Sequence, residues 1–187
     1  MKSLLIFSSI LALSSPAMAA PFTYAPKDCE FQITFPEKPF IETKCAANGK
    51  ECSEIVTYTK AIGAESSTNF RVSCNPISAN DITKYTPSIL EETLKQMVKS
   101  NGLEPYDTQS GEKDGYKNAS TLSLSQRDTK PLIYNGQIWA GEKSLFTLEA
   151  EMVGSQNNEI EKIFAEILKN TYPKDHPPVI KPADKKN

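Results

Sequence analysis

The residues most often used for acid–base and nucleophilic chemistry are sparse in this chain. Its 187 residues include one histidine, His176, which follows Asp175 in a proline-rich C-terminal stretch. A Ser-His-Asp or Cys-His device needs a histidine held in place as the base, and we interpret His176 as a solvated tail residue. The H-E-x-x-H zinc motif and a glycine-rich phosphate loop are also missing from the sequence. We therefore predict no catalytic residue, no metal site and no cofactor.

Pairs of carboxylates could still serve a hydrolase. Glu149 and Glu151 alternate along a predicted strand and so share a face, and Asp107 and Asp114 flank a predicted loop. Glycosidases use two such groups as the acid and as the base or nucleophile. Because carboxylate pairs are also ordinary on solvated surfaces, a carboxylate-dependent hydrolase is kept as an alternative.

Aromatic and charged residues near the end of a predicted hairpin form a candidate partner surface. They are Tyr134, Trp139, Glu142 and Lys143, the last two within the predicted turn. Aromatic side chains in such places often anchor protein partners. The alternative interpretation of Trp139 is a core residue covered by a helix.

The first nineteen residues have the features of an export signal. Lys2 precedes an apolar run from Leu4 to Leu13, and Ala17-Met18-Ala19 has the small-x-small pattern of a cleavage site. The apolar run is shorter than the roughly 20 residues that span a bilayer. We expect cleavage after Ala19 and a periplasmic or secreted mature protein, with an uncleaved signal anchor as the alternative.

The 168 residues that follow suit a single domain. One of the 21 basic residues, Lys2, lies in the predicted signal. The mature chain therefore has 20 basic and 23 acidic residues and a net charge of −3. This balance argues against nucleic acid, which needs a basic surface, and no second segment is apolar enough to span a membrane. We predict a lead-in at 20–27, one domain at 28–173 and a disordered tail with prolines and lysines at 174–187.

All four cysteines lie between Cys29 and Cys74, with Cys45 and Cys52 between them. An even number of cysteines in an exported chain usually means disulfide bonds. Zinc knuckles and redox dithiols would show closely spaced C-x-x-C pairs, which this sequence lacks. We therefore predict two structural disulfides.

Two pairings fit the spacing of the cysteines. Residues equidistant from a hairpin turn face each other, and this favours Cys29 with Cys45 and Cys52 with Cys74, each pair centred on a predicted turn. The alternative joins Cys45 to Cys52 across the Asn48-Gly49 turn and leaves Cys29 with Cys74. The first pairing is our prediction.

Alternation of apolar and polar residues predicts a series of strands. In the first of them Phe31, Ile33 and Phe35 share one face. Residues 103–115 are polar and turn-rich and are predicted to form a surface loop or a short edge strand. A tight turn at Asn135-Gly136 is an alternative to the long hairpin that we favour near the end of the chain. The other predicted strands are 40–45, 54–60, 69–74, 119–125 and the hairpin arms 132–139 and 145–153.

Two stretches change to a helical period. Thr86 can cap a helix with Pro87 at its first position, and Asn101-Gly102 supplies its C-terminal stop. A second helix is predicted from Asn158, where Glu161 three residues later resembles a capping box. Each helix carries an apolar stripe that must pack on a sheet.

The order strands, helix, strands, helix predicts an α+β domain: a mostly antiparallel sheet with two packed helices and disulfide-stapled N-terminal strands. The opening Phe31-x-Ile33-x-Phe35-Pro36-x-x-Pro39, the middle helix, the late hairpin and the closing Ile163-Phe164-x-x-Ile167-Leu168 resemble the Mog1/PsbP-like α/β/α sandwich over residues 28–172. The resemblance implies this fold. It also implies an accessory or binding role, since members of known function include photosystem assembly and stabilising subunits and a GTPase-binding factor. No functional residue of the family has a counterpart here, and the cysteine block is not part of its general pattern.

We therefore expect an exported, non-catalytic binding or accessory protein whose partner is an unknown envelope or secreted protein. The alternative is a small-ligand-binding protein or a hydrolase that uses carboxylates in the concave face of the sheet.

Overall fold

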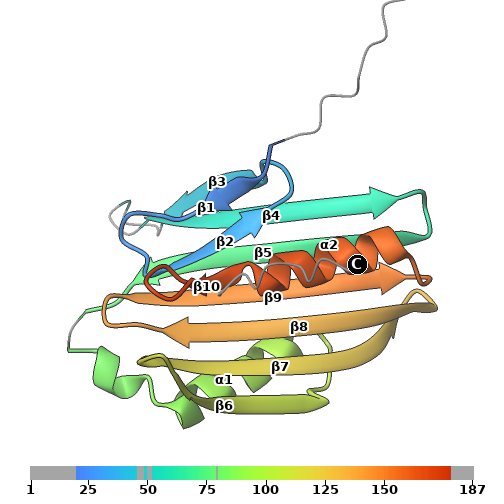
Figure 1. The fold of residues 1–187 in the computed structure, drawn as a ribbon. Coiled ribbons are helices and arrows are strands. Elements are labelled where there is room, and N and C mark those ends of the chain that lie inside the picture. Colours follow the sequence, from blue (N-terminus) through green and yellow to red (C-terminus); the bar gives the residue numbers. More distant parts are fainter. Residues whose placement is uncertain (1–19, 46–48, 50–51, 79, 178–187) are drawn as a thin grey trace, which may run out of the picture.

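The computed structural model describes residues 20–45, 49, 52–78 and 80–177 (Figure 1). The predicted signal peptide, Asn48 of the predicted turn and residues 178–187 of the predicted tail lie outside these ranges. None of the described helices is long and apolar enough to cross a membrane. The described residues form β1 (Phe22–Tyr24), β2 (Phe31–Phe35), β3 (Phe40–Cys45), β4 (Cys52–Ile62), β5 (Ser66–Pro76), the 3₁₀ helix η1 (Ile82–Lys84), α1 (Pro87–Ser100), β6 (Asp107–Lys113), β7 (Tyr116–Arg127), β8 (Lys130–Ala140), β9 (Ser144–Gly154), α2 (Asn158–Lys169) and β10 (Thr171–Pro173).

Seven of the strands form one antiparallel sheet in the order β3-β4-β5-β9-β8-β7-β6. The long hairpin predicted near the end of the chain is confirmed as β8–β9, and Gly136 lies within β8 rather than in a turn. The polar stretch 103–115 contains β6, an edge strand of this sheet. The predicted fold class, an α+β domain with a mostly antiparallel sheet and two packed helices, is confirmed.

The first predicted strand belongs to a second, smaller sheet. β2 pairs with β1 on one side and with β10 on the other, both antiparallel. β1 lies in the predicted lead-in 20–27, and β10 directly follows α2. The predicted pairing of Cys29 with Cys45 about a turn instead requires β2 and β3 to form a hairpin. That prediction is wrong, because after Phe35 the chain passes from the small sheet to the far edge of the large one.

The two helices lie on opposite faces of the seven-stranded sheet (Figure 1). On one face, Phe164 and Ile167 of α2 join β2 and the central strands β4, β5 and β9 in the largest apolar cluster. On the other face, Leu90 and Leu94 of α1 pack on Ile138 of β8 and on β7. On its face, α2 therefore covers the half of the sheet formed by β4, β5 and β9. On the opposite face, α1 covers the half formed by β6, β7 and β8.

Side chains at the helix starts explain where the helices begin. The Thr86 hydroxyl accepts a hydrogen bond from Ile89 N (3.3 Å), which confirms the predicted cap of α1. The cap of α2 is Asn157, one residue before the predicted one, and its side chain accepts from Glu159 N and Ile160 N (both 3.1 Å). Each cap satisfies N–H groups that have no partner within the helix.

The disulfides are Cys29–Cys74 and Cys45–Cys52. Two structural disulfides were predicted correctly, but the favoured pairing is wrong and the alternative is the one formed. Cys45 and Cys52 lie directly opposite each other in the β3–β4 hairpin. Cys29 precedes β2, which crosses the large sheet instead of pairing with β3, and this brings Cys29 to Cys74 at the end of β5. Ile55 of β4 pairs with Ser73, so Cys52 and Cys74 are out of register.

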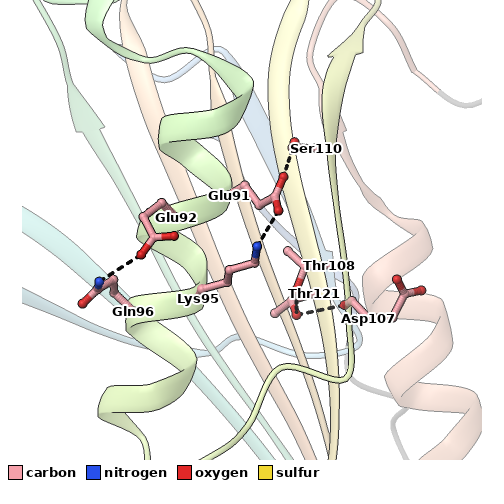
Figure 2. A network of polar contacts seen from close by, with 8 residues as sticks. All are labelled: Glu91, Glu92, Lys95, Gln96, Asp107, Thr108, Ser110 and Thr121. Carbon is pink, nitrogen blue, oxygen red and sulfur yellow. Dashed lines mark hydrogen bonds and ion pairs between the residues drawn. The ribbon is translucent and has the colours of Figure 1, made fainter.

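A polar network ties α1 to the edge strand β6, as Figure 2 shows. The Glu91 carboxylate accepts from Lys95 Nζ (2.6 Å) one turn along the helix and from Ser110 Oγ (2.7 Å) of β6. On the strands, Thr121 Oγ1 donates to the carbonyl oxygen of Asp107 (2.9 Å). The hydrogen bonds from Lys95 and then Ser110 hold the pKa of Glu91 below its ordinary value. This edge of the sheet is therefore fastened under a helix.

Candidate functional site

The structure does not bring the four residues of the predicted partner surface together. Tyr134 is fully buried beneath α1, whereas Trp139 is half-buried on the opposite face of the sheet. They are five positions apart in β8, and side chains an odd number of positions apart point to opposite faces of a strand. Glu142 and Lys143 are exposed in the β8–β9 turn.

Trp139 belongs to a chain of side-chain hydrogen bonds along β8. Its indole N–H donates to Gln137 Oε1 (3.1 Å), Gln137 Nε2 donates to Asn135 Oδ1 (3.0 Å), and Asn135 Nδ2 donates to the carbonyl oxygen of Thr121 (3.3 Å). The indole also packs against Phe31 of β2, with ring centroids 6.0 Å apart. The two amides and the indole are consequently held in fixed orientations.

Apolar side chains of β7 and β8 extend this row. Leu122 lies opposite Asn135 and Leu124 lies opposite Ile133, and Leu124 is 56% exposed. Next to Ile133, a hollow of about 240 Å³ opens between β8, β9 and the start of α2, and Ile133 and Ile160 are among its lining residues. We call this surface the tryptophan half-face; it consists of Ser120, Leu122, Leu124, Ile133, Asn135, Gln137 and Trp139. It offers an aromatic edge, oriented amides and apolar groups on one strand pair.

The turn that carries Glu142 and Lys143 is held by the partly buried Glu30. The Glu30 carboxylate accepts from the backbone N–H groups of Glu142 (3.0 Å), Lys143 (2.9 Å) and Ser144 (3.0 Å). A Cβ atom on Gly141 would lie 2.1 Å from Glu30 Oε2, so only glycine allows this approach. The turn beside Trp139 is therefore fixed by its backbone, and the side chains of Glu142 and Lys143 project from it.

The carboxylates singled out in the sequence have separate partners. Glu149 Oε2 accepts from Asn101 Nδ2 (2.8 Å) and from Tyr134 Oη (3.2 Å). Glu151 is bound by both terminal nitrogens of Arg127 (2.8 and 3.0 Å). Burial, and then the charge of Glu149, raises the pKa of Tyr134 well above its ordinary range, so Tyr134 remains a donor. The two glutamates are thus engaged in structural contacts with different groups.

Asp107 and Asp114 are not brought together either. Asp107 begins β6, while Asp114 lies in the turn after the other end of this strand, with a φ of 54°. The pair therefore does not flank a common pocket.

A polar groove runs beside α1, over the half of that sheet face that α1 does not reach. It consists of two adjoining hollows of about 230 and 180 Å³ that share Arg71 and Glu149. The Arg71 guanidinium is 3.7 Å from Glu149 Oε1, and its side chain is 59% exposed. We call this the α1 groove; its other lining residues include Ser53, Ser73, Asn75, Met97, Asn101 and Thr147. Hydroxyl, amide and guanidinium groups in one groove suit a small polar ligand.

The single histidine lies at the start of the predicted tail, where residues 174–176 contact the domain or one another. His176 Nδ1 is 3.0 Å from the Asp175 carboxylate, which also accepts from Tyr116 Oη (2.8 Å). The hydrogen bonds from His176 and then Tyr116 lower the pKa of Asp175. Lys174 N donates to the carbonyl oxygen of Glu30 (2.8 Å). Among the described residues, no three His, Cys, Asp or Glu side chains gather as a metal site.

Arg71, Asn101 and Glu30 were missed by the sequence analysis. Each contacts a site residue from a distant part of the chain: Arg71 from β5, Asn101 from the end of α1 and Glu30 from the segment before β2. Asn101 was interpreted only as a helix stop. Local sequence patterns carry no signal for such contacts.

The fold and the disulfides define a class: an α+β domain of the kind that folds in an oxidising compartment outside the cytoplasm. No family model and no curated protein matches the chain. Among solved structures, LpqN, described as involved in cell envelope biogenesis of Mycobacterium tuberculosis, is similar over 85% of this chain and 86% of its own, with 12% identity and a TM-score of 0.34. A TM-score this low does not establish a common fold, and the Mog1/PsbP-like resemblance stays a prediction.

Proposed function

We propose that this chain is an exported, non-catalytic binding protein that holds a protein partner of the cell envelope on its tryptophan half-face. The observation that carries this proposal is the hydrogen-bonded row from Trp139 through Gln137 to Asn135. Side chains that are ordered before binding lose less conformational entropy when a partner docks. Aromatic anchors beside apolar groups and amides are the composition expected of a protein-binding surface.

The proposed location is the periplasm or the exterior of the cell. The predicted signal peptide at 1–19 and the two disulfides both favour export. An accessory role is also what the Mog1/PsbP-like resemblance implies.

A binding role is favoured over hydrolysis by the contacts of the glutamates. A general acid or a nucleophile must reach the substrate, but Arg127 occupies both oxygens of Glu151. Glu149 accepts from Asn101 and Tyr134. Through these contacts Glu149 links the end of α1 to β9, and Glu151 links β7 to β9.

The test is site-specific photo-crosslinking of the tagged mature protein in its native envelope. A crosslinker at Leu124 samples the tryptophan half-face. One at Thr59, an exposed residue of β4 whose side chain is on the face that carries α1, samples the opposite face of the sheet. We expect one dominant crosslinked protein from position 124 and none from position 59. Leu124→Lys should abolish capture of that protein, and Thr59→Lys should leave it unchanged. Equal crosslinking from both positions, or none from position 124, would contradict the proposal.

A second candidate function is the binding of a small polar ligand in the α1 groove. The specific observation is that Arg71, largely exposed, lies where the two hollows join. A thermal-shift panel of sugars, short peptides and carboxylates tests it. A ligand that raises the melting temperature of the wild type and not of Arg71→Gln would support the groove; no shift across the panel would remove it.

A further inference from the structure

The two edges of the seven-stranded sheet differ in how they are protected. At one edge, β6 is bound to α1 through Glu91 and Ser110 (Figure 2). At the other edge, β3 pairs with β4 alone among the described strands (Figure 1). Five of its six residues are exposed, and the ring of Phe40 at its start is 69% exposed. An edge strand presents a row of backbone N–H and C=O groups to which another strand can pair.

The charges on β3 are arranged for pairing with an identical strand. Glu42 and Lys44 point to the same face, are about half exposed, and lie 3.5 Å apart (Oε2 to Nζ). In a two-fold antiparallel pair, residue i of one copy faces residue j of the other and residue j faces residue i. With Thr43 at the centre, Glu42 of each copy faces Lys44 of the other copy, so two opposite-charge pairs form.

The other symmetric registers are less favourable. A pair centred on Glu42 or on Lys44 places like charges directly opposite, which is destabilising. A pair centred on Ile41 places Glu42 against Phe40. Registers shifted by one residue would bring opposite faces of the two sheets to the same side. The register about Thr43 alone pairs opposite charges twice.

Both ends of β3 limit the length of the ladder. Pro39 precedes the strand and has no N–H group to donate. Cys45 is bonded to Cys52 of β4, which holds the far end of β3 in the sheet. Residues 41–45 of the two copies can therefore pair without either strand leaving its own sheet.

We propose that β3 pairs antiparallel with β3 of a second copy of this chain, centred on Thr43, to form a two-fold dimer with a continuous sheet. The proposal goes beyond the binding function proposed above and does not depend on it. The tryptophan half-face, on β7 and β8, lies away from this edge and remains accessible in the dimer. The α1 groove begins on β4 beside β3, where Ser53 and Ile55 lie opposite Lys44 and Glu42.

Sedimentation velocity of the mature protein over a range of concentrations tests the proposal. We expect a monomer–dimer equilibrium for the wild type. Glu42→Lys places two lysines opposite each other twice, and Lys44→Glu does the same with glutamates. Each variant should raise the dimer dissociation constant by about tenfold or more. A wild type that stays monomeric at every concentration would overturn the proposal.

Two complementation experiments distinguish the register from a general effect of charge. The double variant Glu42→Lys/Lys44→Glu restores both opposite-charge pairs and should dimerise like the wild type. An equimolar mixture of the two single variants should form the heterodimer, because every lysine then faces a glutamate. Dimers that are insensitive to the single changes, or a mixture that stays monomeric, would refute pairing about Thr43. Leu124→Lys, which tests the tryptophan half-face, should leave dimerisation unchanged.

Discussion

Glu30 and Ser144 bind each other through both backbone and side chain. Ser144 Oγ accepts from Glu30 N (2.9 Å), while Glu30 Oε2 accepts from Ser144 N (3.0 Å) and Ser144 Oγ (3.1 Å). Together with the N–H groups of Glu142 and Lys143, these bonds fasten the segment before β2 to the β8–β9 turn. The small sheet is thereby fixed to the large one at a point next to the tryptophan half-face.

We expect Glu30→Ala to lower the free energy of unfolding by about 1–3 kcal/mol, since it removes the charged acceptor of three backbone N–H groups of the turn, including that of the buried Ser144. Urea unfolding of the mature protein measures the change. Glu142→Ala is the matched control, because Glu142 contributes only its backbone N–H, and it should change stability by less than about 0.5 kcal/mol. Equal losses in the two variants would show that Glu30 does not fasten the turn.

The two disulfides should differ in how much they stabilise the fold. Cys29–Cys74 closes a loop with a sequence separation of 45, and Cys45–Cys52 closes one of 7. By the loop-closure entropy of the unfolded chain, we expect a loss of about 4 kcal/mol for Cys29→Ser/Cys74→Ser and about 2 kcal/mol for Cys45→Ser/Cys52→Ser. Urea unfolding under non-reducing conditions tests the order, and peptide mapping of the unreduced protein tests the pairing. A larger loss for the shorter loop would refute this account.

Tyr134→Phe should lower the free energy of unfolding by about 1 kcal/mol, because it removes the buried hydroxyl that donates to Glu149. Tyr106→Phe makes the same chemical change at a side chain that is 74% exposed and should be neutral within about 0.5 kcal/mol. Thermal and urea unfolding of both variants provide the comparison. A neutral Tyr134→Phe would mean that Glu149 is held by Asn101 without the tyrosine.

The Glu91 network should make stability depend on pH. The pKa of this carboxyl is held below its ordinary 4.5 by the hydrogen bond from Lys95 and then that from Ser110. A carboxyl with a lowered pKa in the folded state stabilises the protein above its unfolded pKa, and this contribution is lost as pH falls through the folded pKa. The urea midpoint of Glu91→Gln should therefore lie below that of the wild type at pH 7, and the difference should shrink below pH 4.5.

Glu92→Gln is the control for this experiment, because Glu92 accepts from Gln96 on the helix surface and not from β6. Its difference from the wild type should be small. A Glu91→Gln difference that stayed constant down to pH 3 would assign the effect to packing rather than to the charge.

Features set by neighbours in sequence could be predicted well. The alternation of Phe31, Ile33 and Phe35 gave the first strand, and all three side chains are buried. Thr86 marked the start of α1, and the predicted strand 40–45 coincides with β3. In each case the residues that decide the structure lie within a few positions of one another.

Features set by distant residues could not be predicted. β10 has three residues, too few for alternation to be visible. Because β1 and β10 were both missed, β2 was left with β3 as its partner, and the wrong pairing of Cys29 with Cys45 followed. In the site, Tyr134 and Trp139 were grouped by residue type, although their odd spacing already separates them. Arg71 and Asn101 meet Glu149 only through the sheet order and the packing of α1.

The position of β2 between β1 and β10 sets when the domain can complete its folding. Ile33, fully buried in the centre of β2, pairs with Tyr24 on one side and with Thr171 on the other. A chain that emerges N-terminus first, from a ribosome or from a translocation pore, brings out the second of these partners only near its end. The small sheet and the core beneath it must therefore wait for the last strand.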